Sequence, residues 1–172
     1  VLLVTDSFLR NSGLTAPLES ALHTAGISCT VYDQTQANPT VSNVEDALKL
    51  YRAGNCQAII AFGGGSSMDC AKAVGARVVY PRRSLDKLKG ILRIRRRLPL
   101  LLAVPTTAGT GSETTVTAVI TDDNSHHKYT INSFPLIPRY AVLDPRVTYT
   151  LPPALTATTG MDALTHAIEA YI

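Results

Sequence analysis

The feature that most constrains the fold is the alternation of strand-like and helix-like segments over the first hundred residues. Short runs of β-branched and aliphatic residues indicate strands, and longer segments with apolar residues at helical spacing indicate helices. This alternation with short turns predicts an α/β fold with a parallel sheet and helices on its faces. The expected strands are 1–4, 27–32, 58–62 and 98–104, and the expected helices are 15–25, 43–53 and one that begins at Ser66.

The pattern changes after residue 113. Two β-rich segments, 114–121 and 128–132, flank the turn sequence DDNSHH, which predicts an antiparallel hairpin, and 140–143 adds a short strand. From Pro153 onward the pattern is helical. We therefore expect a domain boundary near residue 150, with an α/β domain over 1–150 and the first helices of a second domain over 151–172.

The composition is that of a folded chain with one sizeable core, because 45% of the residues are hydrophobic and 17% are charged. The net charge of +3 is local, since eight of the 16 basic residues fall within 82–97. That run has no interleaved aromatic residues, so we interpret it as a solvated surface segment and expect no nucleic-acid partner. No apolar stretch approaches the roughly 20 residues that span a bilayer, so no membrane partner is expected.

The three cysteines form no C-x-x-C pair, and no secretory prefix precedes them, which favours reduced thiols and a cytoplasmic location. Cys70 follows a glycine-rich loop near a helix amino terminus, where a lowered thiol pKa is conceivable, but a packed structural cysteine is the favoured interpretation. The chain begins inside the apolar run VLLVTD and ends on HAIEAYI without a helix stop signal, so we expect further chain on both sides.

The segment AIIAFGGGSSMDCAKAVG places three glycines, Gly63, Gly64 and Gly65, between a strand and a helix. Ser66 opens the helix, with Asp69 three residues later in capping-box spacing. Glycines let a phosphate approach the backbone, and a helix amino terminus offers free N–H groups and a partial positive charge. The segment predicts a pyrophosphate cradle. The alternative is a tight strand-to-helix turn, because the G-x-G-x-x-G fingerprint is absent.

A second loop, PTTAGTGSE, directly follows the strand 98–104 and offers the hydroxyls of Thr106, Thr107, Thr110 and Ser112. Clustered hydroxyl and backbone donors suit the phosphates, ribose and nicotinamide amide of a dinucleotide. A polar turn with local side-chain-to-backbone bonds is the alternative. Two such loops at adjacent strand ends favour the nucleotide interpretation.

Asp6 ends the first strand, where a carboxylate accepts hydrogen bonds from ribose hydroxyls and repels a 2′-phosphate. This position favours NAD over NADP. Asp33, after the second strand, could play the same part, and either carboxylate could merely cap a turn.

The last segment, TGMDALTHAIEAYI, has a polar and an apolar helical face. Asp162, His166 and Glu169 share the polar face, and an Asp and a His at i and i+4 can bind one divalent metal ion. A solvated polar face is the alternative, because two ligands do not make a site. The opposite face carries Leu164, Ala167, Ile168 and Tyr171.

Three segments, GGGSSMDCAK, AVPTTAGTGSE and TGMDALTHAIEAYI, occur in the same order and at similar spacing as signature segments of iron-containing (group III) alcohol dehydrogenases, a family that the chain resembles over essentially its whole length. The resemblance implies a Rossmann-like parallel sheet with helices on both faces, followed by the start of an all-helical domain, with a cleft between the two. This is the dehydroquinate synthase-like architecture.

The resemblance also implies roles for single residues. It places Asp6 at the adenosine ribose, Asn38 near the cofactor and Lys128 near the ribose. Asp162 and His166 become catalytic residues and the first two of four metal ligands, with two histidines expected beyond Ile172. The cofactor's pyrophosphate, phosphates and nicotinamide side are assigned to Gly63, Gly64, Gly65, Ser66, Asp69, Thr106, Thr107, Thr110 and Ser112.

The implied reaction is the interconversion of an alcohol and an aldehyde or ketone by hydride transfer, with NAD and Fe(II) as cofactors, although Asp and His ligands also suit Zn. We expect a small-molecule alcohol or aldehyde as partner and a homo-oligomer. Two alternatives remain open. The chain could belong to an NAD- and metal-dependent sugar-phosphate cyclase or polyol dehydrogenase of the same fold, or it could be a nucleotide-binding fragment without activity.

Overall fold

The computed structural model describes all residues, 1–172, and contains a parallel sheet of five strands in the order β2-β1-β3-β5-β8. Every neighbouring pair in this sheet is parallel. The central strands are buried on both faces, which explains why they appear in the sequence as continuous apolar runs. The strands are β1 (Leu2–Val4), β2 (Thr30–Tyr32), β3 (Ala58–Gly63), β5 (Leu100–Pro105) and β8 (Tyr140–Ala141).

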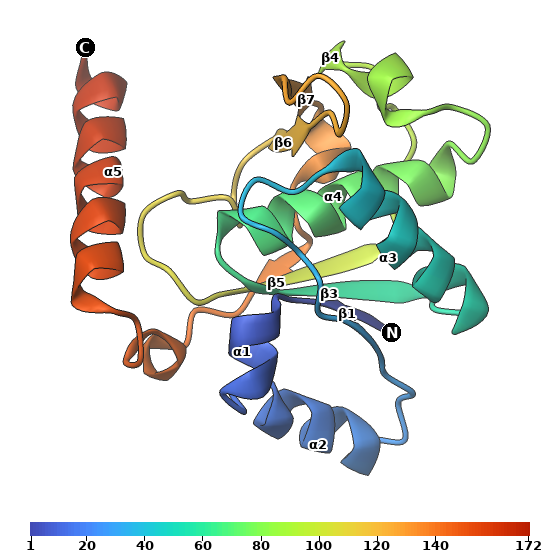
Figure 1. The fold of residues 1–172 in the computed structure, drawn as a ribbon, viewed down its shortest axis with the longest axis horizontal. Coiled ribbons are helices and arrows are strands. Elements are labelled where there is room, and N and C mark those ends of the chain that lie inside the picture. Colours follow the sequence, from blue (N-terminus) through green and yellow to red (C-terminus); the bar gives the residue numbers. More distant parts are fainter.

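Helices cover both faces of this sheet, as the sequence predicts (Figure 1). Successive residues of a strand point to opposite faces. On one face Ile59 packs in a cluster of 27 buried residues with helices α3 (Val41–Ala53) and α4 (Gly65–Val79). On the other face Ile60 packs in a smaller cluster with α1 (Ser7–Asn11) and α2 (Ala16–Thr24).

The strand order reverses at β1, because β2 lies on one side of it and β3 on the other. In parallel α/β sheets a ligand binds outside the carboxyl ends of the strands at this kind of switch point. Asp6 lies two residues beyond the end of β1, and the three glycines begin at Gly63, the last residue of β3. The topology therefore places two of the predicted site segments at the expected ligand position.

A second sheet of three strands packs beyond α4 (Figure 1). Strands β6 (Thr117–Thr121) and β7 (Lys128–Asn132) pair antiparallel, so the predicted hairpin is confirmed. The third strand, β4 (Gly90–Ile91), pairs with β7 and was not predicted, because two residues give no periodic signal. All eight basic residues of 82–97 are exposed, in agreement with a solvated surface segment.

Three short 3₁₀ segments connect these elements: η1 (Leu85–Leu88), η2 (Phe134–Leu136) and η3 (Pro145–Thr148). The buried side chains of Leu85, Leu88 and Ile94 attach the basic segment to the main core. No helix in the structure combines the length and the apolar character that crossing a membrane requires.

The final helix, α5 (Pro153–Tyr171), stands apart from the sheet (Figure 1) and has no buried residue. Its first turns nevertheless approach the loop after β5. An added Cβ at Gly109 would lie 2.5 Å from the carbonyl oxygen of Thr159. The loop and the helix therefore touch at backbone distance, which only a glycine at 109 permits.

Candidate nucleotide and metal site

A cavity of about 550 Å³ lies at the carboxyl ends of β1, β3 and β5. The glycine-rich turn and the hydroxyl-rich loop both line it, and the first turns of α5 close one side. The sequence-predicted residues that line it are Asp6, Gly64, Gly65, Ser66, Thr106, Thr107 and Thr110. The lining also includes Gln36 and Ala37 from the loop after β2 and Leu155 and Thr159 from α5, which sequence reasoning did not single out.

The three glycines play different parts. Gly63 has φ +150°, and an added Cβ would lie 2.8 Å from the Ser67 Cβ, so the turn itself requires glycine there. Gly64 and Gly65 have no such constraint, and both border the cavity. A tight strand-to-helix turn therefore accounts for Gly63 only, and the other two glycines leave the backbone open to a ligand.

The capping box predicted for this helix is wrong. Helix α4 begins at Gly65 with Gly64 as its N-cap, and no side chain caps it. The Ser66 hydroxyl instead accepts a hydrogen bond of 3.2 Å from the backbone N–H of Asn38, and Asp69 turns toward the hairpin. Without a capping side chain, N–H groups of the first turn stay available to an anion at the cavity.

The two loops are in direct contact. The backbone N–H of Thr106 donates to the carbonyl of Gly63 at 3.0 Å. An added Cβ at Gly64 would lie 3.4 Å from the Thr107 side chain, and one at Gly65 would lie 3.3 Å from the Thr110 side chain. The Thr107 hydroxyl is buried and has no hydrogen-bond partner in the protein. A buried hydroxyl without a partner costs free energy, so this atom suits a polar ligand group in the cavity.

Asp69 and Ser112 do not line the cavity; they bond to each other behind its wall. The Ser112 hydroxyl donates to Asp69 Oδ1 at 3.0 Å, and the backbone N–H of Val119 donates to Asp69 Oδ2 at 3.1 Å. Burial raises the pKa of the Asp69 carboxyl, while the Val119 N–H, the nearby Lys72 and the Ser112 hydroxyl act in the opposite direction. Lys72, which sequence reasoning did not consider, lies in the same buried network.

Asn38 and Lys128 meet at the rim of the cavity, beside Ser66. The Lys128 Nζ donates to Asn38 Oδ1 at 2.8 Å, and both residues are exposed. Asn38 adopts a positive φ of 59°, which Asn tolerates better than most residues. The structure thus joins a loop after β2, the start of α4 and the start of β7 at one point.

Asp6 both borders the cavity and caps a helix. Its Oδ1 accepts the backbone N–H of Leu9 at 2.9 Å at the start of α1, and no protein group donates to its Oδ2. Asp33, the alternative from the sequence, does not line this cavity and accepts only from the neighbouring Gln34. Of the two carboxylates, only Asp6 borders the cavity with an oxygen that no protein group occupies.

Asp162 and His166 lie side by side on α5, with 3.7 Å between Asp162 Oδ1 and His166 Nε2. Two atoms that each bind a metal at about 2.0 to 2.2 Å can be at most about 4.4 Å apart, so this pair fits one ion as an oxygen and a nitrogen ligand. At 100° per residue the pair continues the helix face on which Leu155 and Thr159 border the cavity. No cluster of three metal-ligating side chains occurs within the 172 residues.

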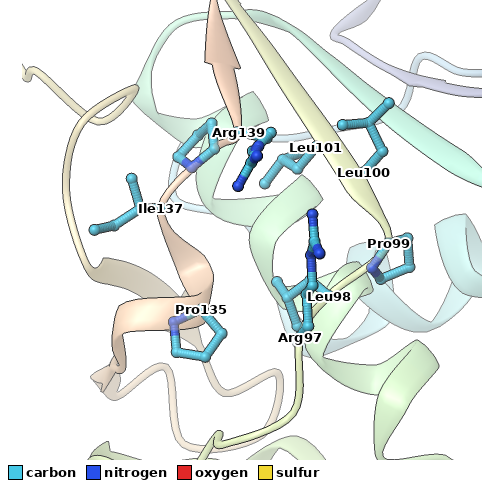
Figure 2. Close-up of a pocket in the computed structure, with 9 residues that line it drawn as sticks. Arg97, Leu98, Pro99, Leu100, Leu101, Pro135, Ile137 and Arg139 are labelled. Carbon is cyan, nitrogen blue, oxygen red and sulfur yellow. The ribbon is translucent and has the colours of Figure 1, made fainter.

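A second hollow, of about 470 Å³, lies at the opposite end of the sheet, between the start of β5 and the segment before β8 (Figure 2). Arg97 and Arg139 border it together with apolar residues and prolines, and it contains no carboxylate, hydroxyl or imidazole side chain. It lies away from the carboxyl ends of the strands, where ligands of parallel sheets bind. We therefore assign the functional site to the cleft at the switch point.

The strand order, the glycine turn at a helix amino terminus and the cleft at the carboxyl ends of the strands define a Rossmann-like α/β domain. Comparison of the sequence with protein families identifies which branch of this fold is present. The chain belongs to the family described as iron-containing alcohol dehydrogenase, whose sequence model matches residues 1–145.

Known proteins of this family are similar to nearly the whole chain. It is 46% identical over 168 residues to the protein named "Probable alcohol dehydrogenase EutG" of Salmonella typhimurium, covering 98% of this chain and 42% of that protein. The crystal structure of a 1,3-propanediol oxidoreductase superposes with a TM-score of 0.95 and 41% identity over 99% of this chain and 44% of its own. The chain thus spans less than half the length of these relatives.

A third relative was solved with a nucleotide. The structure of sulfoacetaldehyde reductase from Bifidobacterium kashiwanohense, described as a complex with NAD⁺, matches 98% of this chain and 44% of its own with a TM-score of 0.85 and 36% identity.

Proposed function

We propose that the protein to which this chain belongs is an NAD-dependent, metal-assisted oxidoreductase that interconverts a small alcohol and its aldehyde or ketone. The observation that carries the proposal is the convergence of three elements on one cleft of about 550 Å³: the carboxylate after β1, the glycine turn after β3 and the hydroxyl-rich loop after β5. The helix face that continues from this cleft bears an oxygen and a nitrogen ligand, Asp162 and His166.

In this proposal the chain's own groups bind and orient the dinucleotide. The free N–H groups of Gly65 and Ser66 at the start of α4 receive the pyrophosphate, and the unpartnered Thr107 hydroxyl donates to it. Asp6 accepts from the adenosine ribose through its free Oδ2 and repels a 2′-phosphate, which selects NAD over NADP. Asn38 and Lys128 close the rim beside Ser66 and contact the cofactor from there.

The remaining predicted residues support this arrangement. Thr106 ties the hydroxyl-rich loop to the carbonyl of Gly63, and the Thr110 side chain packs over Gly65. Asp69 and Ser112 act from behind the wall by fixing the same loop. Gly63 contributes through the turn that its positive φ allows.

When bound, NAD would supply the acceptor for a hydride from the alcohol carbon, and a divalent metal would supply Lewis-acid stabilisation of negative charge on the substrate oxygen. Asp162 and His166 would hold that metal, and Fe(II) and Zn both suit this donor set. We propose further that 151–172 begins a metal-binding helical domain, because α5 leaves its apolar residues Leu164 and Ile168 51% exposed. A homo-oligomer and a cytoplasmic location remain predictions from the sequence.

The test uses the whole protein that contains this chain, purified and supplied with Fe(II) without oxygen, and follows NADH absorbance with primary alcohols and diols as substrates. Net NADH formation is expected, and its absence would exclude a dehydrogenase and favour a cyclase that regenerates its NAD. The variant His166→Ala should lose alcohol oxidation and bound metal by elemental analysis while it keeps NAD affinity, because the cofactor loops lie in the other domain. Retention of both metal and activity would contradict the ligand assignment.

A further inference from the structure

Lys72 is the largest fully buried side chain in the molecule that carries a charge. It lies in the middle of α4 with none of its surface exposed, and lysine is rarely buried in this way unless it is partnered. Its Nζ lies within hydrogen-bonding distance of four oxygens: Ser112 Oγ at 3.2 Å, Thr115 O at 3.0 Å, Thr115 Oγ1 at 2.9 Å and Thr117 O at 2.8 Å. All four belong to one segment, 112–117, which joins the hydroxyl-rich loop to β6.

The nearest opposite charge on α4 is Asp69, one turn before Lys72. The two side chains form no direct ion pair, and the Ser112 hydroxyl lies between them: it accepts from the Lys72 ammonium and donates to Asp69 Oδ1. Asp69 Oδ2 accepts from the backbone N–H of Val119. Two ionic side chains of one helix therefore hold both ends of the segment 112–119, and Glu113 is the other acidic group near Lys72.

This network reaches the cleft through one further bond. The backbone N–H of Ser112 donates to Thr110 Oγ1 at 3.3 Å, and the Thr110 side chain packs over Gly65, where an added Cβ would lie 3.3 Å away. Thr110 and Gly65 both border the cleft, whereas Lys72 does not. The contacts thus run from Lys72 through Ser112 to Thr110 and end at the backbone that faces the proposed pyrophosphate.

We propose that Lys72 is a positioning residue for the nucleotide: its buried ammonium holds the segment 112–117 against α4 and so fixes Thr110 over Gly65 at the width that admits the pyrophosphate. This inference rests on the proposed function. The proposal explains why a charged lysine occupies a fully buried position, where burial of the charge is costly. Burial lowers the pKa of Lys72 to about 8, against the opposing effects of Asp69 and Glu113. A neutral side chain of similar length would avoid that cost, but it would leave the Thr115 carbonyl without a donor and the Thr117 carbonyl with only the 3.4 Å bond from the Thr115 hydroxyl.

The test compares Lys72→Met with Lys49→Met, which removes a lysine whose side chain is 76% exposed on α3 and away from this network. NAD binding is measured by titration well below the melting temperature, together with kcat and KM for NAD in the whole protein. Lys72→Met should bind NAD about tenfold to a hundredfold more weakly, since at least two hydrogen bonds that hold the loop are lost, with a smaller change in kcat at saturating NAD. Its affinity for AMP, which contacts the Asp6 side, should stay within about twofold.

If Lys72 only stabilises the fold, Lys72→Met should lower the melting temperature and leave the NAD affinity of the folded protein unchanged. That result would overturn the proposal. If Lys72→Met does not fold, Ser112→Ala decides, because it removes only the hydroxyl between the two charges. It should weaken NAD binding about threefold to tenfold, and unchanged affinity would overturn the proposal. Absence of NAD binding by the unmodified protein would instead refute the proposed function, so the two failures are distinguishable.

Discussion

Gly63 offers the sharpest test of how this chain builds its glycine turn. Its φ of +150° is a conformation that side-chain-bearing residues rarely adopt, and persisting there costs them about 1–3 kcal/mol. An added methyl group would overlap the Ser67 side chain at the start of α4, which adds an overpacking cost of about 1–3 kcal/mol. We expect Gly63→Ala to lower the free energy of unfolding by about 4 kcal/mol, the sum of mid-range values.

For a domain of this size each kcal/mol corresponds to about 2–4 °C, so the melting temperature should fall by about 8–16 °C. Circular dichroism during heating and urea titration measure both quantities. Gly64→Ala is the matched control, because its φ is −79° and its added methyl would meet Thr107 at an ordinary 3.4 Å. That variant should lose less than about 1 kcal/mol, the scale of a changed N-cap residue.

Equal losses of stability in Gly63→Ala and Gly64→Ala would refute the reasoning from backbone conformation. A larger side chain at the second position tests function instead of folding. Gly64→Val should keep the fold and lose NAD affinity, because the side chain enters the space proposed for the pyrophosphate. Normal affinity in a folded Gly64→Val protein would contradict the cradle assignment.

Three further predictions concern specificity, thiol chemistry and pH. Asp6→Gly should relax the discrimination against NADP by removing repulsion of the 2′-phosphate, whereas improved NADP binding only in Asp33→Gly would show that the wrong aspartate is assigned. Of the three cysteines only Cys29 should react with a thiol reagent in the folded protein, since the others are buried and burial raises the pKa of Cys70 to about 12; rapid labelling of all three would contradict this. Burial lowers the pKa of Lys72 to about 8 in the folded protein, whereas the unfolded chain has the ordinary lysine pKa of 10.5. Between pH 8 and 10.5 the unfolded chain therefore binds more protons than the folded protein. The free energy of unfolding of the unmodified protein relative to Lys72→Met should therefore rise from pH 8 to 10.5, by about 3 kcal/mol in urea titrations, and a fall would reverse the sign we assign.

Much of the fold follows from local pattern in the sequence. The strands β1, β3 and β5 are apolar runs flanked by turn residues, and their identity needs no long-range information. The strand order of the sheet places the switch point at β1, beside Asp6 and the glycine turn. The five-residue helix α1 was not predicted, because it is shorter than the window in which helical periodicity is detectable.

The sequence predictions that failed at the site did so for one physical reason: residues far away in the sequence compete for the same side chains. Ser66 and Asp69 have the spacing of a capping box, yet the first bonds to Asn38, 28 residues away, and the second to Val119, 50 residues away. Lys72 appears in the sequence as a polar residue in an alanine-rich helix, and its partners begin 40 residues later. Local spacing can propose such bonds, but only the tertiary structure decides which partner is present.

Gly109 fixes how closely the loop after β5 approaches helix α5. The loop that borders the cleft meets the carbonyl of Thr159 at this residue, and Asp162 follows three residues later on the same helix, about 4.5 Å further along its axis. A hydride passes only between atoms held about 3–3.5 Å apart, so the separation of the loop and α5 must be set to a fraction of an ångström. A Cβ at 109 would lie 2.5 Å from the Thr159 carbonyl oxygen, so the loop or the helix would have to move to restore an ordinary contact. The missing Cβ of one glycine thus sets the distance between the loop that we propose binds the nucleotide and the helix that we propose binds the metal.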